Sequence, residues 1–433
     1  MVDETRVPVI IAVRPTVFFV KDGNGLNQMV EIEVESPTTI QGVALRTVFG
    51  PNKVDIPIGE IPGGKTTHNV LIPDIRDAVH VRFSLMKGVD ILASKELVWK
   101  PGKHWNVYLV QVSHHDLGYT DLPTNVLREY DTFFDNMLGM CKETDDWPEE
   151  CKFRYTVEQA WSILHYFENR PPEVLAEMIE RIKEGRLEVT ALIGNQVSEI
   201  HGPEELVRAL YPAFRLKRKY GIPITTAELN DVPGFSWGLA TVLANAGIRY
   251  FSPGLPDYFD WYYHVHGFWD DEAVLPNGDP DAFWWEAQDG KKVLLWYGGQ
   301  GAGGTSDPML PALADYLRKV EDQGYSYDSL RYWVQGGHRD NAPPLLDFAM
   351  TARRWNEKWA YPRVICGTSA MFFQDLVEQI GPELRTYRGE LPGTDYPVGA
   401  LSTAFETALN RVTHDVLLTA ERFASIATAV SDY

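Results

Sequence analysis

The stretch that most constrains the fold is Val107–Asp121, which reads VYLVQVSHHDLGYTD. It opens with an apolar run rich in β-branched and aromatic residues and free of breakers, which predicts a strand buried on both faces. Because side chains alternate along a strand, His114 and Asp116 share one face and His115 takes the other. An imidazole and a carboxylate at the C-terminal end of a buried strand indicate a divalent metal site, although a hydrophilic strand end meeting solvent is the simpler alternative.

The composition excludes some classes of function. The chain has 433 residues, 44% of them hydrophobic, which is enough for a large core and too long for one ordinary domain. Its 60 acidic residues against 40 basic ones produce a formal net charge of -20, so a nucleic acid is not an expected partner. The 12% aromatic content suits either a core or a sugar-binding surface.

The chain start and the cysteines bear on the compartment. The first segment, MVDETRVPVIIAVRPTVFFV, has acidic residues before its apolar run, so it reads neither as a signal peptide nor as a membrane span. Three cysteines are too few for a disulfide framework, although Cys141 and Cys151 could pair in an oxidising compartment. A cytoplasmic protein is expected, and a secreted one stays open if a leader has been removed.

The sequence pattern divides the chain into different regions. Residues 1–102 contain short alternating or apolar runs separated by turn clusters such as KDGNG and IPGGKT, which predicts a β-sandwich. From residue 103 to about 400, strands alternate with helices, which predicts a mainly parallel sheet with crossovers. The helices are expected over 122–144, over 171–184 with Gly185 after its end, over 201–222 as one helix, and over 238–248. Residues 401–433 begin a long amphipathic helix.

The order of these segments resembles the N-terminal catalytic domain of glycoside hydrolase family 38, the zinc-dependent retaining α-mannosidases. The motifs that carry the likeness are SHHDLGYTD, FRYTVEQAWSILHYFENRPPEVLAEMIERIKEGRLEV, NDVPGFSWGLATVLANAGIRYF, FWWEAQDGKKVLLW and TYRGELPGTDYPVGALSTAFETALNR. The likeness runs from about Asn106 to the end. It implies a (β/α)7-like barrel after the sandwich, with residues 401–433 as the start of a helical bundle.

The resemblance also implies one divalent ion, zinc with Mn²⁺ or Ca²⁺ as alternatives, bound by His114, Asp116 and Asp231. Asp231 would then be the catalytic nucleophile as well, whereas by itself an Asp between a strand and a helix is often an N-cap. The family's fourth ligand is a His near the closing motif, where this chain reads GTDYPVG. Counting back from Gly399 selects Asp395, with His338 as the alternative ligand or as a neighbour in the pocket.

A retaining glycosidase also needs an acid/base carboxylate about 5–5.5 Å from the nucleophile. In the family this residue follows a Gly- and Asp-rich loop, and YWVQGGHRDNAPP makes Asp340 the candidate, although Asp-Asn before two prolines also suits a turn. Tyr119 stands where the family has a Trp that stacks on the sugar. Trp237 and His338 complete the predicted substrate-binding residues.

The expected activity is retaining, metal-dependent hydrolysis of an α-mannoside or a related α-glycoside. The alternatives are a metal-dependent carbohydrate deacetylase, in which Asp231 would act as a base, and a non-catalytic carbohydrate-binding protein. A carbohydrate is the expected ligand in each case, no membrane partner is expected, and a homo-oligomer stays open.

Overall fold

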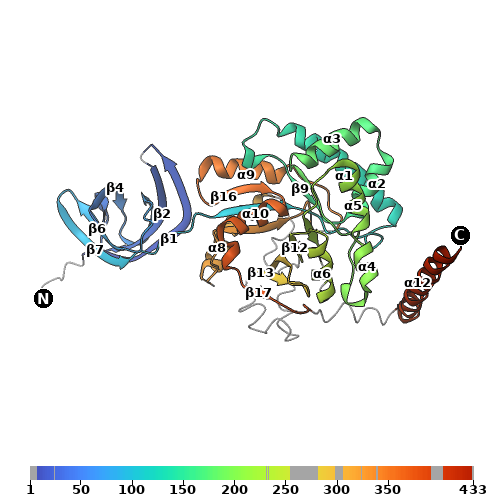
Figure 1. Cartoon of the computed structure of the whole chain (residues 1–433). Coiled ribbons are helices and arrows are strands. Elements are labelled where there is room, and N and C mark those ends of the chain that lie inside the picture. The colour runs from blue at the N-terminus through green and yellow to red at the C-terminus, as the bar shows by residue number, and fades with distance from the viewer. Residues whose placement is uncertain are drawn as a thin grey trace.

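The computed structural model describes residues 7–23, 25–230, 232, 234–253, 281–297, 306–322, 324–337, 340–391 and 403–431. An N-terminal β part lies at one end of the molecule, an α/β part occupies the middle, and helix α12 lies at the other end (Figure 1). Within the described ranges, no helix combines the length and the apolar character that crossing a membrane requires.

The N-terminal part consists of two antiparallel sheets, ordered β1-β2-β5 and β4-β3-β6-β7. One buried apolar cluster draws on both sheets, with Val30 and Ile32 from the first and Leu45 and Phe83 from the second. The alternating burial along β4 and β5 fits sheets with one face toward that cluster. The strands are β1 (Val9–Asp22), β2 (Gly25–Ser36), β3 (Ile40–Phe49), β4 (Asn52–Ile61), β5 (Gly64–Pro73), β6 (His80–Lys87) and β7 (Asp90–Val98).

The α/β part contains three described sheets, most of whose strand pairs are parallel. Their orders are β15-β8-β16, β10-β9 and β11-β12-β14-β13-β17, and only β13 and β14 pair antiparallel. The strands are β8 (Asn106–Gln111), β9 (Tyr155–Val157), β10 (Leu187–Val189), β11 (Thr226–Glu228), β12 (Tyr250–Ser252), β13 (Asp281–Glu286), β14 (Lys292–Tyr297), β15 (Ser329–Val334), β16 (Arg363–Gly367) and β17 (Thr386–Tyr387).

Helices surround these sheets, except α12, which lies apart from them at the far end of the molecule (Figure 1). They are α1 (Pro123–Glu143), α2 (Ala160–Asn169), α3 (Pro172–Lys183), α4 (Pro203–Arg208), α5 (Tyr211–Tyr220), α6 (Trp237–Asn245), α8 (Ser306–Asp322), α9 (Asp347–Lys358), α10 (Ser369–Ile380) and α12 (Ala404–Val430), with 3-10 turns η1 (Glu149–Cys151), η2 (Ser198–Ile200) and η5 (Gly381–Glu383). Helix α3 begins at a proline and is followed by Gly185 with φ 73°, as its sequence predicts.

The single helix expected over residues 201–222 is wrong. The segment forms α4 and α5, with Ala209 and Leu210 between them. Pro212 is the second residue of α5 and has no N–H to donate to the preceding turn, so a continuous helix would lose a hydrogen bond there.

The predicted barrel is only partly reflected in the strand pairing. The described strands hold a mixed α/β fold in which β8 is the centre of one parallel sheet, but they do not close on themselves. The three cysteines are buried and free, so the alternative of a Cys141–Cys151 disulfide is wrong.

Candidate active site

The site begins where β8 ends, at the sequence SHHD. The ordered strand stops at Gln111, yet the alternation continues through the next residues. His114 Nε2 lies 3.2 Å from Asp116 Oδ1. The His115 ring packs 4.3 Å from the Tyr130 ring, between centroids, and its Nδ1 lies 3.4 Å from Glu158 Oε2. The predicted convergence of His114 with Asp116 is therefore confirmed.

Glu158, one residue beyond β9, holds this strand end in place and was missed by the sequence reasoning. Its side chain is fully buried. Oε1 lies 3.2 Å from His114 Nδ1, and Oε2 accepts a 2.5 Å hydrogen bond from the His115 amide. A carboxylate on Nδ1 orients the imidazole and leaves Nε2 as the nitrogen for a ligand. The signal in the sequence was an acidic residue directly after a short strand. Asp116 likewise follows a strand, in the segment His114–Asp116, which is called the H-x-D segment below.

The same carboxylate reaches the end of a third strand. Glu158 Oε1 accepts a hydrogen bond of 3.1 Å from the amide of Asn230, which follows β11 and is itself buried. Asp231, the predicted nucleophile, is the next residue in the chain and lies outside the described residues. Glu158 thus ties the H-x-D segment to the immediate neighbour of Asp231.

A second link joins the segment after Asp231 to a distant part of the chain. Phe235 and Leu391 form an antiparallel bridge, with hydrogen bonds of 2.6 Å from Phe235 N to Leu391 O and 2.9 Å in the opposite direction. Asp231 precedes this bridge by four residues and Asp395 follows it by four. Asp395 also lies outside the described residues.

Asp340 lies beside the H-x-D segment because Asn341 anchors its loop there. The backbone N–H of Asn341 donates to the carbonyl oxygen of His114 at 2.9 Å, and the backbone N–H of Ala342 donates to Ser113 Oγ at 2.7 Å. The structure therefore places Asp340 near His114 and Asp116, which are two of the four predicted metal ligands. His338, two residues earlier, is outside the described residues.

The charges of this site are strongly coupled. Burial by itself would lower the pKa of His114, but Glu158 and Asp116 outweigh burial and raise it well above its ordinary value. Burial would raise the pKa of Glu158, but His114 and His115 hold it well below its usual range. Burial, with Asp116 and Glu158 nearby, raises the pKa of Asp340, against the opposing charge of His114. A carboxyl with a raised pKa suits a proton donor.

Two of the described residues, His114 and Asp116, fit a metal ion by their donor chemistry. Within the described ranges, no group of three or more His, Cys, Asp or Glu side chains is arranged to hold one. His114 and Asp116 nevertheless offer a nitrogen and an oxygen 3.2 Å apart, and the other ring nitrogen is already engaged by Glu158. This is the donor chemistry that zinc takes, with an oriented imidazole. A metal must displace the proton from His114, so binding would be coupled to pH.

The interior next to the site contains a buried ion pair. Arg331 on β15 donates to Glu228 Oε1 on β11 at 2.9 Å, and both side chains are fully buried. Ser369, at the start of α10, also donates to Glu228 Oε1. Burial raises the pKa of Glu228 to about 7, against the opposing effect of Arg331. This pair ties β15, the end of β11 and the start of α10 together.

Comparison with known proteins identifies the family. Residues 104–390 match the model of the glycosyl hydrolases family 38 N-terminal domain. The chain belongs to glycosyl hydrolase family 38. No curated protein matches it at a significant level.

Two solved structures resemble the chain. An α-mannosidase from Enterococcus faecalis V583 is 20% identical, with a TM-score of 0.50 over 66% of this chain and 31% of that protein. A family 38 protein from Enterococcus faecalis is 18% identical, with a TM-score of 0.43 over 66% of this chain and 29% of that one. The chain therefore spans about a third of their length.

The two predicted aromatic contacts have different surroundings in this family 38 chain. Tyr119 is 87% exposed in the loop after β8, and the stacking role stays a prediction. Trp237 begins α6, where its indole N–H donates to Glu286 O at 2.8 Å and Arg388 lies over its ring. The N–H of Trp237 and one face of its ring are therefore already in contact with other residues, and its role in sugar binding stays a prediction.

Proposed function

We propose that this family 38 chain carries the catalytic site of a metal-dependent retaining glycosidase that cleaves an α-mannoside or a related α-glycoside. The observation that supports it most is the shared carboxylate of Glu158. It contacts His114 at one strand end and Asn230, the neighbour of Asp231, at another. One buried group thereby holds a predicted metal ligand and the backbone neighbour of the predicted nucleophile.

In this proposal His114, Asp116, Asp231 and a fourth ligand, Asp395, hold one divalent ion, zinc in the first place. The bound ion would supply a positive charge that binds sugar hydroxyls and keeps carboxylates ionised. The bridge between Phe235 and Leu391 supports Asp395, since it fixes the chain four residues from both carboxylates. His338 stays the alternative ligand, since it lies only three residues before Asn341.

The chemistry needs two carboxyl groups from this chain. Asp340 would donate its proton to the glycosidic oxygen while Asp231 attacks the anomeric carbon, so the C–O bond breaks and an ester to Asp231 forms. Asp340, now a carboxylate, would take a proton from water, whose oxygen attacks the same carbon and releases Asp231. The raised pKa of Asp340 suits the first of these roles.

We also propose the finer architecture. The sheets centred on β8 and β11 would be parts of a (β/α)7-like barrel over residues 103–400, with His114, Glu158 and Asn230 after the C-terminal ends of its strands. The two N-terminal sheets, which share one apolar cluster, would form a β-sandwich.

Trapping the intermediate tests the proposal. The metal-loaded chain is mixed with an α-mannoside that has a good leaving group, quenched, and its peptides are weighed. The expected result is one hexosyl unit on the peptide that contains Asp231, absent in Asp231→Asn. Release of acetate from acetylated sugars without any adduct would indicate a deacetylase instead, and sugar binding with no turnover across an α-glycoside panel would indicate a binding protein.

A further inference from the structure

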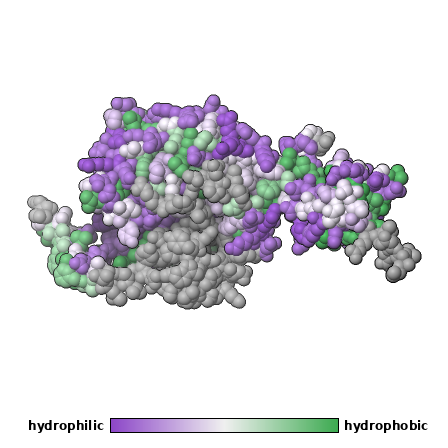
Figure 2. All heavy atoms as spheres, turned by 180° about the vertical axis from the view of Figure 1, so that it is seen from behind, coloured by the Kyte–Doolittle hydropathy of each residue, from purple (hydrophilic) through white to green (hydrophobic). Residues whose placement is uncertain are grey.

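Helix α12 carries an apolar stripe that no described part of the chain covers. None of its residues is buried. Hydrophobic colour runs along this helix at the left edge of the molecule in Figure 2. The stripe consists of Phe405, Leu409, Val412, Val416, Phe423, Ile426 and Val430, each between 53% and 78% exposed.

The spacing of the stripe is that of a coiled-coil seam. With Thr419 included, its members follow one another at alternating steps of four and three residues from Phe405 to Val430. Such a seven-residue repeat keeps one narrow line of side chains toward a partner helix along its whole length. A helix that covers a globular core has a wider apolar face.

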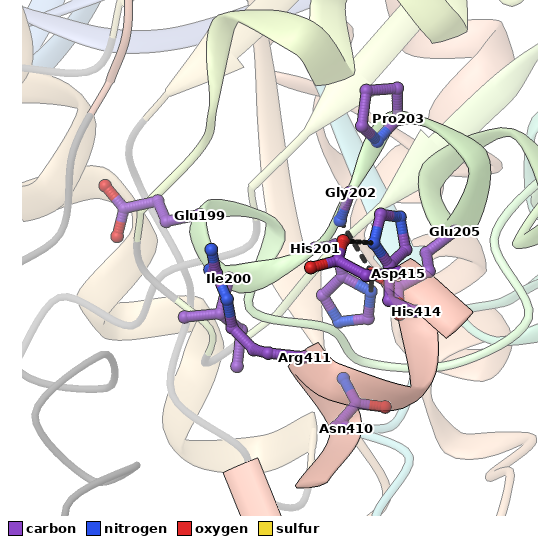
Figure 3. A pocket seen from close by; sticks show the side chains of 10 residues that line it. All are labelled: Glu199, Ile200, His201, Gly202, Pro203, Glu205, Asn410, Arg411, His414 and Asp415. Atoms are coloured by element: carbon purple, nitrogen blue, oxygen red, sulfur yellow. Dashed lines mark hydrogen bonds and ion pairs between the residues drawn. The ribbon is translucent and has the colours of Figure 1, made fainter. Parts of the chain in front are cut away.

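The helix contacts its own chain through another side. Glu421 accepts a hydrogen bond of 3.0 Å from Arg208 on α4, and the His414 ring lies against Gly202, where a Cβ would overlap it. His414 and Glu421 are seven residues apart and lie opposite the seam in the repeat. Figure 3 shows His414 and Arg411 directed toward residues 199–205, around a pocket of about 270 Å³. The contacts made within the chain therefore leave the seam exposed.

We propose that α12 is a dimerisation helix that pairs antiparallel with α12 of a second copy of this chain. In that register the layers are self-complementary, with Phe405 opposite Val430, Leu409 opposite Ile426, Val412 opposite Phe423 and Val416 opposite Thr419. Each aromatic ring meets a valine, so large and small side chains alternate along the seam.

The charges that flank the seam favour the same arrangement. In the antiparallel register Asp415 lies across from Arg422 of the second copy, and the two-fold symmetry repeats this pair. In a parallel pair, Asp415 and Arg422 would instead face Ala420 and Ala427. The helix has three acidic and two basic residues, so it is nearly neutral, whereas the whole chain has a formal net charge of -20. Two copies of the acidic chain can therefore meet at this helix with little repulsion.

Sedimentation equilibrium of the whole chain over a wide concentration range tests the proposal. The informative variant is Val416→Glu, and the matched control is Leu417→Glu, because the two neighbours are 60% and 52% exposed but only Val416 is on the seam. Val416→Glu should weaken the dimer by at least about a hundredfold, since it buries two unpaired carboxylates. Leu417→Glu should dimerise like the wild type.

Exposed charge reversals, which should not disturb folding, test the orientation. Asp415→Arg and Arg422→Asp should each weaken the dimer by about tenfold through like-charge contacts, and the double variant should restore it. A wild type that stays monomeric, or that binds a helix of another protein only, overturns the proposal. A dimer that survives Val416→Glu overturns it too, and a double variant no tighter than the single ones overturns the antiparallel pairing.

Discussion

The side chain of Asn341 clamps the backbone of Asp116 from both sides. Asn341 Nδ2 donates to Asp116 O at 2.7 Å, and the Asp116 amide donates to Asn341 Oδ1 at 3.0 Å. Tyr130 donates to the same Oδ1 at 2.9 Å. Asn341 adopts φ 51°, a left-handed conformation that Asn tolerates better than most residues. The clamp fixes a predicted metal ligand and the neighbour of the predicted acid/base at the same time.

Removing this clamp should therefore weaken metal binding. We expect Asn341→Ala to lower metal affinity about 10–100-fold, as losses of outer-shell contacts do. The measurement is competition with a chelator of known affinity. Asn341→Gly separates the loss of the side-chain amide from backbone strain, because glycine accepts the backbone conformation but lacks the amide. It should lose the same metal affinity while avoiding about 1 kcal/mol of backbone strain. Unchanged affinity in both variants would refute the role of the clamp.

The metal content of the purified protein is the next prediction. Elemental analysis should find about one divalent ion per chain, zinc in the first place. His114→Ala should lose it, and Glu158→Gln should retain it more weakly, because the amide still contacts Nδ1 but does not favour the metal-bound imidazole as strongly. If the wild type contains no metal and the His114→Ala variant behaves identically, the proposed metal site is wrong.

The fourth ligand can be assigned by reloading. The metal is first removed from the wild type and from the variants Asp395→Ala and His338→Ala. Each protein is then titrated with Zn²⁺, Mn²⁺ and Ca²⁺. We expect Asp395→Ala to lose metal and His338→Ala to keep it. A site with three carboxylates and one imidazole should also tolerate Mn²⁺ and Ca²⁺ better than a two-imidazole site, since both prefer oxygen. Loss of metal in His338→Ala alone would reverse the assignment.

Asp340 should matter most for poor leaving groups. If it is the acid, Asp340→Asn should slow ordinary glycosides strongly, by about 10²–10⁴-fold, and spare the glycosylation of those whose leaving group needs little protonation. Added azide should partly restore turnover of the activated substrates. Equal losses on both kinds of substrate would show that Asp340 has another role. Asp121→Asn, which changes an exposed carboxylate in the loop after β8, is the control.

Glu228 should make stability depend on pH. Its pKa is raised from 4.5 to about 7 in the folded chain, so the folded state binds a proton more tightly than the unfolded one. The stability that this proton contributes is complete below about pH 4.5 and is lost as the pH rises through 7. Between pH 5 and pH 8 we expect Glu228 to account for a loss of about 2 kcal/mol in the free energy of unfolding.

Denaturant titrations at the two pH values check this. Glu228→Gln keeps an oxygen for Arg331 and Ser369 but cannot titrate, so its loss between pH 5 and pH 8 should be smaller than that of the wild type. Glu60→Gln on the exposed part of β4 should behave like the wild type. An identical pH dependence in Glu228→Gln and the wild type would contradict the assignment.

The sequence by itself determined the local features of this chain. Strand β8 and the convergence of His114 with Asp116 follow from a breaker-free apolar run and from the period of two along a strand. Helix α3 follows from its proline start and from Gly185. Even the missed break between α4 and α5 had a local sign in Pro212. These features depend on neighbours within a few residues.

Only the tertiary structure decided which distant groups support the site. Glu158 contacts residues 44 positions before it and 72 after it, and Asn341 contacts Asp116 across 225 positions. Nothing local distinguishes these side chains from a strand-end carboxylate or a turn asparagine. The same is true of Glu228 and Arg331, whose pairing depends on the burial of both. The role of a polar side chain is set by its partners and by its exclusion from water, and both are properties of the folded chain.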